Sequence, residues 1–335
     1  MRYIFVGTVE ASYHALEEML IQGANVVGVF TLAAEYASRH SDFADLSPLA
    51  QSYRIPLWHI NNINEPEVVA QMQALKPDYI FVIGWSQILK AAVLRLPKYA
   101  CIGFHPSLLP QNRGRAVLPW TILQGLRRSG GTLFYLDEGV DSGDILMQKA
   151  FDLEPDETAR TLYNKITAVL REMIREALPL LENGKPPRYP QDHSKATYCA
   201  KRTPADGLID WQQPAERVWT LIRAVGEPYP GAFTFHRGRK VIIWEAKFIG
   251  SAPYIGLPGQ IHAIRQDGVL VQCGDGKHIL LQTVQPEGGE RCAAIDYFTK
   301  VHEVLGIDWL RLYYQLQESS WRAPDEQSIS YRSSS

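Results

Sequence analysis

The sequence predicts an α/β fold, in which a doubly wound, mostly parallel sheet is followed by a small antiparallel β-barrel. Two observations predict the sheet: short, continuously apolar runs in the first half are bounded by Gly, Pro or Asp, and stretches of helical periodicity separate them. A third observation predicts the barrel, because short strand patterns with glycine-rich turns fill the chain after about residue 205. We expect the first part to be Rossmann-like and the second to be OB-like.

Apolar runs and helical patterns alternate through the first half of the chain. The runs predict strands at residues 3–6, 26–30, 56–58, 79–83, 101–104 and 132–136. The intervening patterns predict helices at residues 10–21, 46–53, 66–75 and 162–181. The last helix is the longest, and Gly184 with the prolines that follow marks its end.

The pattern changes after this long helix. Residues 184–203 are predicted to be a linker, followed by a helix at 216–225 and strands at 232–236, 240–243, 259–263, 269–273 and 278–283. We therefore expect an α/β domain over residues 1–183 and a β-barrel domain over residues 204–318. The polar, serine-rich residues 319–335 are predicted to be a disordered tail.

The charge and the cysteines restrict the class of protein. The 34 basic and 36 acidic residues give a net charge of −2, without the basic excess typical of nucleic-acid or membrane-surface binders. Four scattered cysteines show no pairing pattern and indicate reduced thiols. The N-terminus resembles a strand entering a helix rather than a signal peptide, and every apolar run is too short to span a bilayer. A cytoplasmic protein without a membrane partner is therefore expected.

One segment with residues suited to catalysis follows the predicted strand at residues 101–104. It reads Gly-Phe-His-Pro-Ser-Leu-Leu-Pro-Gln-Asn-Arg-Gly-Arg over residues 103–115. Ligands of open α/β sheets bind beyond the carboxyl ends of the strands, so His105 occupies a position suited to catalysis. The alternative is a histidine that merely ends a strand.

A second polar segment follows the strand at residues 132–136. Residues 137–144 read Asp-Glu-Gly-Val-Asp-Ser-Gly-Asp, which makes a tight loop with three aspartates. Considered alone, this loop is better explained as an ordinary acidic turn. Its combination with the histidine segment changes that interpretation.

Together the two segments resemble the 10-formyltetrahydrofolate-dependent formyltransferase family. The shared pattern is HPSLLP…RG followed by DEGVDSGDIL, with 36 residues from His105 to Asp141. The N-terminal segment and the sequence NVVGVFT resemble methionyl-tRNA formyltransferases, and IDW and IRAVGEPYPGAF resemble their C-terminal domain. These later motifs are still more similar to the formyltransferase domain that acts on UDP-4-amino-4-deoxy-arabinose. The resemblance covers roughly residues 1–290.

The resemblance implies a reaction and catalytic residues. A primary amine attacks the formyl carbon of 10-formyltetrahydrofolate, an oxyanion forms, and a proton leaves the amine. His105 would bond the oxyanion or relay the proton, and Asp141 would orient the imidazole and support its charge. No metal is implied, and the histidines of the chain lack metal-type spacing.

The resemblance also implies where the folate and the acceptor bind. A pterin pocket of largely backbone groups would be formed by Trp85, Ser86, Gln87, Ile88, Leu89, Asp137, Gly139 and Val140. The alternative for Trp85 and Leu89 is that their side chains belong to the core. The residues expected to bind the acceptor are Thr8, Ser107, Arg113, Gly114 and Arg115. Arg115 would pair with a nucleotide diphosphate, or it would only stabilise its own loop.

One position departs from the family pattern. The family has Asn two residues before the histidine, where it supplies an oxyanion hydrogen bond, and this chain has Gly103. Losing one such donor typically costs about 100- to 1,000-fold in rate. Three accounts are open: a backbone N–H or a water takes the role because glycine leaves room, another side chain reaches in, or the protein is a weakened or non-catalytic folate-binding homologue.

The acceptor is expected to be a nucleotide-linked amino sugar. Methionyl-tRNA formyltransferases carry a basic glycine-rich insertion after the second strand, whereas residues 31–45 of this chain are not basic. From residue 203 onward the chain has 13 Lys and Arg against 15 Asp and Glu, which does not favour tRNA phosphates. Methionyl-tRNA is the less favoured alternative, and the sequence leaves the oligomeric state open.

Overall fold

The computed structural model describes residues 1–184, 186–307, 312–314 and 316–317. The first half is built on a seven-stranded sheet in the order β3-β2-β1-β4-β5-β7-β8. Its strands are β1 (Tyr3–Val6), β2 (Val26–Leu32), β3 (Leu57–Ile60), β4 (Tyr79–Val82), β5 (Ala100–His105), β7 (Arg128–Tyr135) and β8 (Ile145–Asp152). The first five strands of this order run parallel, whereas β7 and β8 are antiparallel to their neighbours. The predicted mostly parallel, doubly wound sheet is confirmed.

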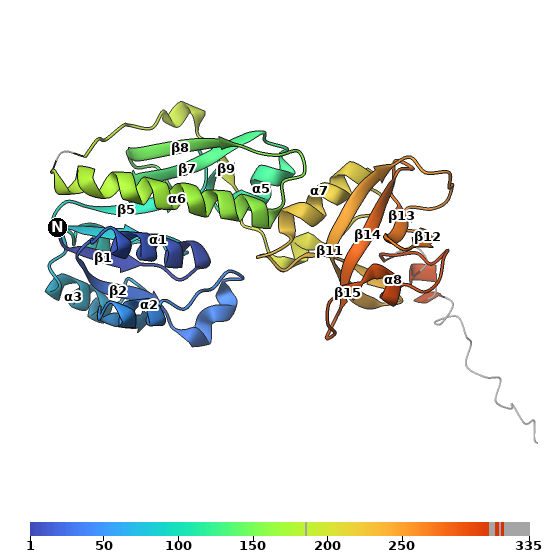
Figure 1. Ribbon diagram of the computed structural model, residues 1–335, viewed down its shortest axis with the longest axis horizontal. Helices are drawn as coiled ribbons and strands as arrows, with labels where there is room; N and C mark the ends of the chain where they lie inside the picture. The colour runs from blue at the N-terminus through green and yellow to red at the C-terminus, as the bar shows by residue number, and fades with distance from the viewer. Residues whose placement is uncertain (185, 308–311, 315, 318–335) are drawn as a thin grey trace, which may run out of the picture.

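Alternate residues of the central strands enter separate cores on the two faces of the sheet. Tyr3 and Phe5 pack with apolar residues of α1 (Glu10–Ile21) and α6 (Ala159–Glu182). Ile4 and Val6 belong to the opposite core, which includes residues of α3 (Pro66–Ala74). Both faces are thus covered, which explains why these strands read as continuously apolar. Figure 1 shows α6 lying along the sheet, with α7 near the end of α6.

Shorter elements complete the first half and the segment that follows it. They are η1 (Ala34–Arg39), α2 (Ser47–Ser52), α4 (Ala91–Leu94), β6 (Arg113–Gly114), α5 (Val117–Leu123), η2 (His193–Lys195), β9 (Tyr198–Cys199) and η3 (Pro204–Gly207). The predicted linker, residues 184–203, runs along the first half: β9 pairs with β6, and Tyr189 bridges to Ile145. It therefore carries contacts as well as connecting two domains, and the domain boundaries remain predictions.

The second half is an antiparallel sheet, as predicted. It has the order β10-β11-β14-β13-β12, and β15 also pairs with β14. The strands are β10 (Ala232–His236), β11 (Arg239–Gly250), β12 (Ile261–Arg265), β13 (Gly268–Gln272), β14 (His278–Pro286) and β15 (Cys292–Ala293). Within the described residues β10 and β12 do not pair, so the sheet expected to form a small OB-like barrel is not closed. Closure depends on the tilt and stagger of the strands, which the pattern of a single strand does not reveal.

Helix α7 (Ala215–Val225) joins the two halves. Its buried Val218 and Ile222 lie in one core with Leu162 and Ile166 of α6 and with residues of the antiparallel sheet. The short helix α8 (Ala294–Tyr297) also packs on this sheet. The predicted tail at residues 319–335 lies outside the described residues. Within the part that is described, no helix has the length and apolar character needed to cross a membrane.

Candidate active site

The two polar segments meet on one face of the sheet. His105 is the last residue of β5, and Gly103 lies two positions earlier on the same face. Because β7 runs antiparallel to β5, its end at Tyr135 lies beside Ile102, three residues before His105. The chain after β7 therefore has to fold back across this face. Leu136 covers Gly103 on the way, and Asp141 reaches the imidazole.

His105 and Asp141 form a partly enclosed pair. Nδ1 of His105 lies 3.5 Å from Oδ2 of Asp141, an ion-pair distance rather than a short hydrogen bond. Nε2 of His105 lies 2.7 Å from the carbonyl oxygen of Asn112. The histidine is 5% exposed, so its ring is held mainly by these two neighbours and by packing.

This geometry fixes the proton on the imidazole. A carbonyl oxygen only accepts hydrogen bonds, so Nε2 must carry a hydrogen to bond Asn112. In the neutral ring Nδ1 is then a bare acceptor that faces a carboxylate. A proton taken up on Nδ1 would therefore lie between the imidazole and the carboxylate of Asp141. Such a pair is suited to general acid–base chemistry.

The carboxylate of Asp141 is held by the backbone of the first segment. Asp141 has a left-handed φ of 50°, and its Oδ2 accepts a 2.8 Å hydrogen bond from the amide of Gly114. Two residues later, a Cβ on Gly143 would lie 1.8 Å from the carbonyl oxygen of Tyr135, so only glycine fits this tight return. A side chain larger than hydrogen at position 143 would therefore clash with the backbone, which explains the glycine at this point of the loop.

The residues predicted for the acceptor have different environments. Thr8 is fully buried at the end of β1, and its hydroxyl has no hydrogen-bond partner among the described residues. Ser107 is buried and donates to the carbonyl of Gln111. Arg113 is 2% exposed, which favours a structural role over ligand contact. Arg115 is exposed and donates to the carbonyl of Ser86, so it links its loop to the predicted pterin stretch.

The predicted pterin stretch lies directly after β4. Leu89 is a core residue and Trp85 packs against the same core, as the alternative interpretation of these side chains proposed. Gln87 uses its amide to hold the chain after β3, accepting from the amide of Ile63 and donating to the carbonyl of Asn61. Ile88 is 70% exposed. The stretch therefore offers mainly backbone groups to a ligand.

In the other predicted pterin segment, Asp137 accepts from the amide of Gly139 and from the hydroxyl of Ser142, so its carboxylate shapes the turn. Val140 is exposed at the tip of this loop. Pterin contact by Asp137, Gly139 and Val140 stays a prediction, because their own hydrogen bonds explain the loop without a ligand.

Two candidate residues were missed in the sequence. The first is Thr31 near the end of β2, which is 1% exposed and whose hydroxyl has no hydrogen-bond partner among the described residues. The hydroxyl of Thr8 after β1 and Nε1 of Trp85 after β4 are likewise buried without a partner there. Val6 pairs with both Phe30 and Val82, so the three polar groups follow the carboxyl ends of adjacent parallel strands, where the strand order reverses.

The second missed residue is Gln191, whose side-chain amide bonds two carbonyls of the Asp141 loop. Neither a lone threonine nor a glutamine in a linker has a sequence signal.

Gly103 does not leave the open space that the sequence suggested. A Cβ at this position would lie 2.6 Å from Cδ2 of Leu136 and 3.1 Å from the ring of Phe134. The room beside Gly103 is therefore filled by Leu136, which disfavours the account in which a water occupies the space that glycine leaves. The carbonyl of Asn112, and not its side chain, is what contacts His105.

We predict that Gly103→Asn lowers stability by about 1–3 kcal/mol, because the new side chain must displace Leu136. Turnover should fall as well, since Leu136 leads directly into the loop that carries Asp141. Adding Leu136→Ala makes room for the amide, so the double variant should be more stable and more active than Gly103→Asn. Thermal denaturation and kcat of the two single variants and the double variant check this. A single Gly103→Asn variant with unchanged Tm and many-fold higher turnover would contradict it.

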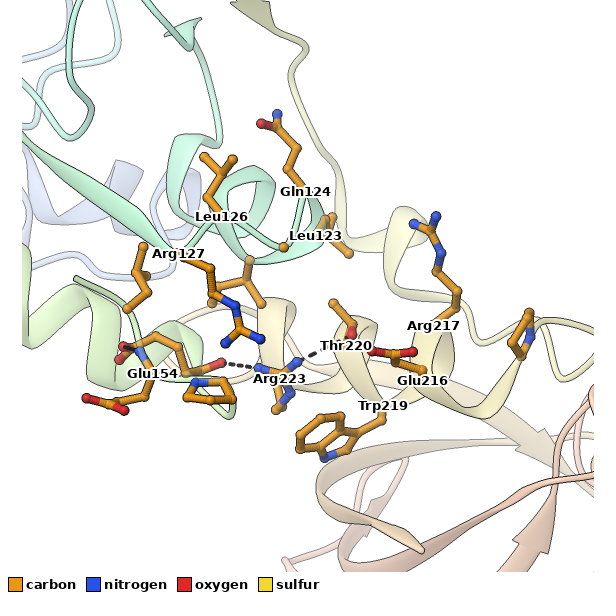
Figure 2. Close-up of a pocket in the computed structure, with 16 residues that line it drawn as sticks. Leu123, Gln124, Leu126, Arg127, Glu154, Glu216, Arg217, Trp219, Thr220 and Arg223 are labelled. Atoms are coloured by element: carbon orange, nitrogen blue, oxygen red, sulfur yellow. Dashed lines mark hydrogen bonds between the residues drawn. The ribbon is translucent and has the colours of Figure 1, made fainter. Parts of the chain in front are cut away.

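A separate groove of about 450 Å³ lies between the two halves of the chain. Figure 2 shows that Arg127, Arg217 and Arg223 share this groove with Glu154 and Glu216. Arg223 donates to the carbonyl of Glu157 and to Thr220, so its charge is already engaged locally. None of the predicted site residues lines this groove.

The chemistry of the site is thus concentrated in His105 and Asp141. Across the residues that the structure describes, no group of three or more His, Cys, Asp or Glu is arranged to hold a metal ion. The fold and this pair define the class as an α/β protein whose sheet carries a buried histidine beside an aspartate.

Comparison with known proteins assigns the family. Residues 4–178 match the formyl transferase family, and residues 201–302 match the formyl transferase C-terminal domain. A methionyl-tRNA formyltransferase of Alkaliphilus oremlandii is 34% identical over 300 residues, covering 89% of this chain and 96% of that protein. The chain therefore belongs to the formyl transferase family, and the resemblance found in the sequence is confirmed.

Solved structures agree with the fold. HypX from Aquifex aeolicus, determined in complex with tetrahydrofolic acid, superposes with a TM-score of 0.62 at 20% identity, covering 89% of this chain and 47% of that one. An N-formyltransferase from Helicobacter canadensis, in complex with folinic acid and dTDP-3-aminofucose, gives 0.61 at 19% identity, covering 84% and 98%. At these identities the similarity concerns the fold alone.

Proposed function

We propose that this formyltransferase moves the formyl group of 10-formyltetrahydrofolate to the primary amine of a nucleotide-linked amino sugar. The observation that carries the reaction is the His105–Asp141 pair, with Nε2 committed to a carbonyl and Nδ1 facing the carboxylate. The proposal extends the family membership by naming both the donor and the acceptor.

The residues around the pair fit a folate. Arg115 of the histidine segment donates to the carbonyl of Ser86, and the adjacent amide of Gly114 donates to Asp141, so the stretch from Gly84 to Leu89 is linked to the site through this segment. The buried Nε1 of Trp85 has no partner within the described residues and is available to a ligand. When bound, the folate supplies a formyl carbon that is open to attack by an amine. Two structural relatives that were solved with tetrahydrofolic acid or folinic acid support this choice.

The chain itself handles the proton. The attacking nitrogen loses a proton as its bond to the formyl carbon forms, and the pair accepts that proton between Nδ1 and Asp141. The same proton can then be returned to the folate nitrogen as its bond to the formyl carbon breaks. His105 and Asp141 end the cycle in the state in which they began, so no further reactant is needed.

The segment after β2 supports a small acceptor. Residues 31–46 contain one arginine and three acidic residues. This segment is fastened to the site, because the amide of Ala44 bonds the carbonyl of Thr8, and Asp42 accepts from Tyr163 of α6. A compact acidic segment here does not supply the phosphate contacts from which tRNA affinity is largely built. Exposed Arg115 provides a cation for a diphosphate.

Formylation of methionyl-tRNA is the second candidate. It is favoured by the methionyl-tRNA formyltransferases that share about a third of their residues with this chain over both halves, such as that of Geotalea uraniireducens at 35% identity over 299 residues. The two candidates share the formyl donor and differ in the acceptor.

We predict that a UDP-, GDP- or dTDP-linked amino sugar is formylated faster than charged initiator tRNA, and that its binding tolerates salt. Sugar binding should change little from low to physiological salt, because few phosphates are neutralised, whereas tRNA binding falls steeply with salt. Formyl transfer from 10-formyltetrahydrofolate to each acceptor is measured at two salt concentrations, alongside the Tm shift that each acceptor produces. Faster formylation of the initiator tRNA than of every amino sugar would replace the first candidate by the second.

A further inference from the structure

A buried polar network connects the catalytic loop to the segment after α6. Its centre is Arg113, whose Nη2 donates to Oε1 of Gln191 at 2.6 Å and lies 3.1 Å from Nδ1 of His193. Its Nη1 donates to the hydroxyl of Tyr198 at 3.1 Å. Since a guanidinium only donates, Nδ1 of His193 must be the acceptor. All three partners belong to residues 191–198, so this segment holds the arginine in place.

Gln191 continues the network to the catalytic aspartate. Its Nε2 donates to the carbonyl oxygen of Asp141 at 2.9 Å and to that of Gly143 at 2.6 Å. The side chain is 5% exposed, so water competes little for these bonds. Both hydrogens of the amide are used on the turn, and its oxygen is used on Arg113. One side chain therefore fixes two successive backbone points of the loop that carries Asp141.

This clamp acts at the point where the loop is most constrained. Asp141 has a left-handed φ of 50°, an uncommon conformation for a residue other than glycine, although aspartate tolerates it better than most. On one side the amide of Gly114 holds its carboxylate, and on the other Gln191 holds its carbonyl. Without Gln191 nothing described in the structure bonds that carbonyl, and the loop is free to relax.

We propose that Gln191 is a positioning residue for formyl transfer, which rests on the function proposed above. It acts through Asp141, by keeping the carboxylate at its distance of 3.5 Å from Nδ1 of His105. Small displacements of a catalytic group cost up to about 100-fold in rate. The segment after α6 is therefore part of the catalytic apparatus, although it lies 50 residues beyond Asp141 in the sequence.

Two substitutions separate positioning from simple structural support. Gln191→Leu removes every bond of the side chain, and we expect kcat to fall about 10- to 100-fold with the folate KM within a few fold. Gln191→Glu keeps an oxygen acceptor for Arg113 and strengthens that contact by charge, but it has no N–H for the two carbonyls. Positioning predicts that Gln191→Glu folds stably and still loses turnover. If Gln191 only holds Arg113, Gln191→Glu should have the turnover of the wild type, unlike Gln191→Leu.

The control is Gln272 of the antiparallel sheet. It is 6% exposed and likewise fixes a loop through its amide, bonding the backbone of Gly256 in both directions. Gln272→Leu should lower Tm without changing the shape of the pH–rate profile. Gln191→Leu should change that profile, because it alters the pair that carries the proton.

A double-mutant cycle and an exchange measurement complete the test. In an Asp141→Asn background Gln191→Leu should cost less than about twofold, because its effect passes through Asp141. Amide hydrogen exchange of residues 137–144, followed without substrate, should be faster in Gln191→Leu than in the wild type. Any of three results would overturn the proposal. They are wild-type turnover in Gln191→Glu, a loss of turnover from Gln191→Leu that is as large in the Asp141→Asn background as in the wild type, and amide exchange of residues 137–144 that is unchanged in Gln191→Leu. If no amine is formylated by the wild type but exchange still rises, the proposed function fails while the clamp on Asp141 stands.

Discussion

Replacement of His105 by alanine should abolish formyl transfer, with turnover reduced about 1,000-fold or more. The substitution removes the group that faces Asp141 and leaves the carbonyl of Asn112 without its donor. Folate affinity should stay within a few fold, because the predicted pterin stretch is held by Gln87 and Arg115 independently of the imidazole. Turnover by rapid quench and folate binding by fluorescence or calorimetry separate these two quantities.

His105→Gln controls for the lost hydrogen bond. Its amide can still donate to the carbonyl of Asn112, but it cannot take up a proton, so it should be as inactive as His105→Ala while being more stable. His59→Ala is the matched control, since His59 is an exposed histidine on the edge strand β3, separated from β5 by other strands. It should retain wild-type turnover. Activity like that of the wild type in His105→Ala would show that the imidazole is not catalytic.

The sequence was informative wherever burial on both faces produced an unambiguous pattern. The strands β1 and β4 are fully buried and were predicted to within one residue, and α1 was predicted with its observed ends. The strand β8 was missed because it lies at the edge of the sheet, where only Leu146 is buried and the later residues alternate between half-buried and exposed, so no continuous apolar run marks it. Helix α5 was also missed, since it follows Ala116 in a left-handed conformation and no common capping residue marks its start.

For the candidate site, the sequence indicated residues but not their geometry. His105 and Asp141 were named, and the structure brings them within 3.5 Å. The path of the chain between β7 and Asp141 was not predicted, because apolar runs do not reveal strand direction. The structure shows that β7 is antiparallel to β5. The chain therefore returns over the face of the sheet, and Leu136 fills the space beside Gly103. Such a contact depends on how two segments are superposed, which no local pattern encodes.

Arg113 and Arg115 illustrate a second limit. Both were expected at the acceptor because their segment resembles that of the formyltransferases. Arg113 is instead buried against Gln191 and Tyr198, whereas Arg115 is exposed. The difference arises from β6 pairing with β9, which draws the segment after α6 over Arg113.

Replacement of Asp141 by asparagine is the second change expected to have a large effect, with turnover reduced about 100-fold or more. The asparagine side chain keeps an oxygen that accepts from the backbone amide of Gly114, and the backbone carbonyl of residue 141 still accepts from Gln191. The fold should therefore be preserved. What disappears is the negative charge opposite Nδ1, and with it the ability of the pair to hold a second proton. Turnover is measured across the pH range together with Tm.

The control for Asp141→Asn is Asp144→Asn in the same loop. Asp144 contributes a solvent-exposed 3.8 Å ion pair with Arg188, so its loss should leave turnover close to that of the wild type. If Asp141→Asn keeps the wild-type rate at every pH, the loop is structural only, and His105 must work without a carboxylate partner. A large loss in Asp141→Asn with intact Tm and a neutral Asp144→Asn instead places the proton between Asp141 and His105, where the bare Nδ1 already faces the carboxylate.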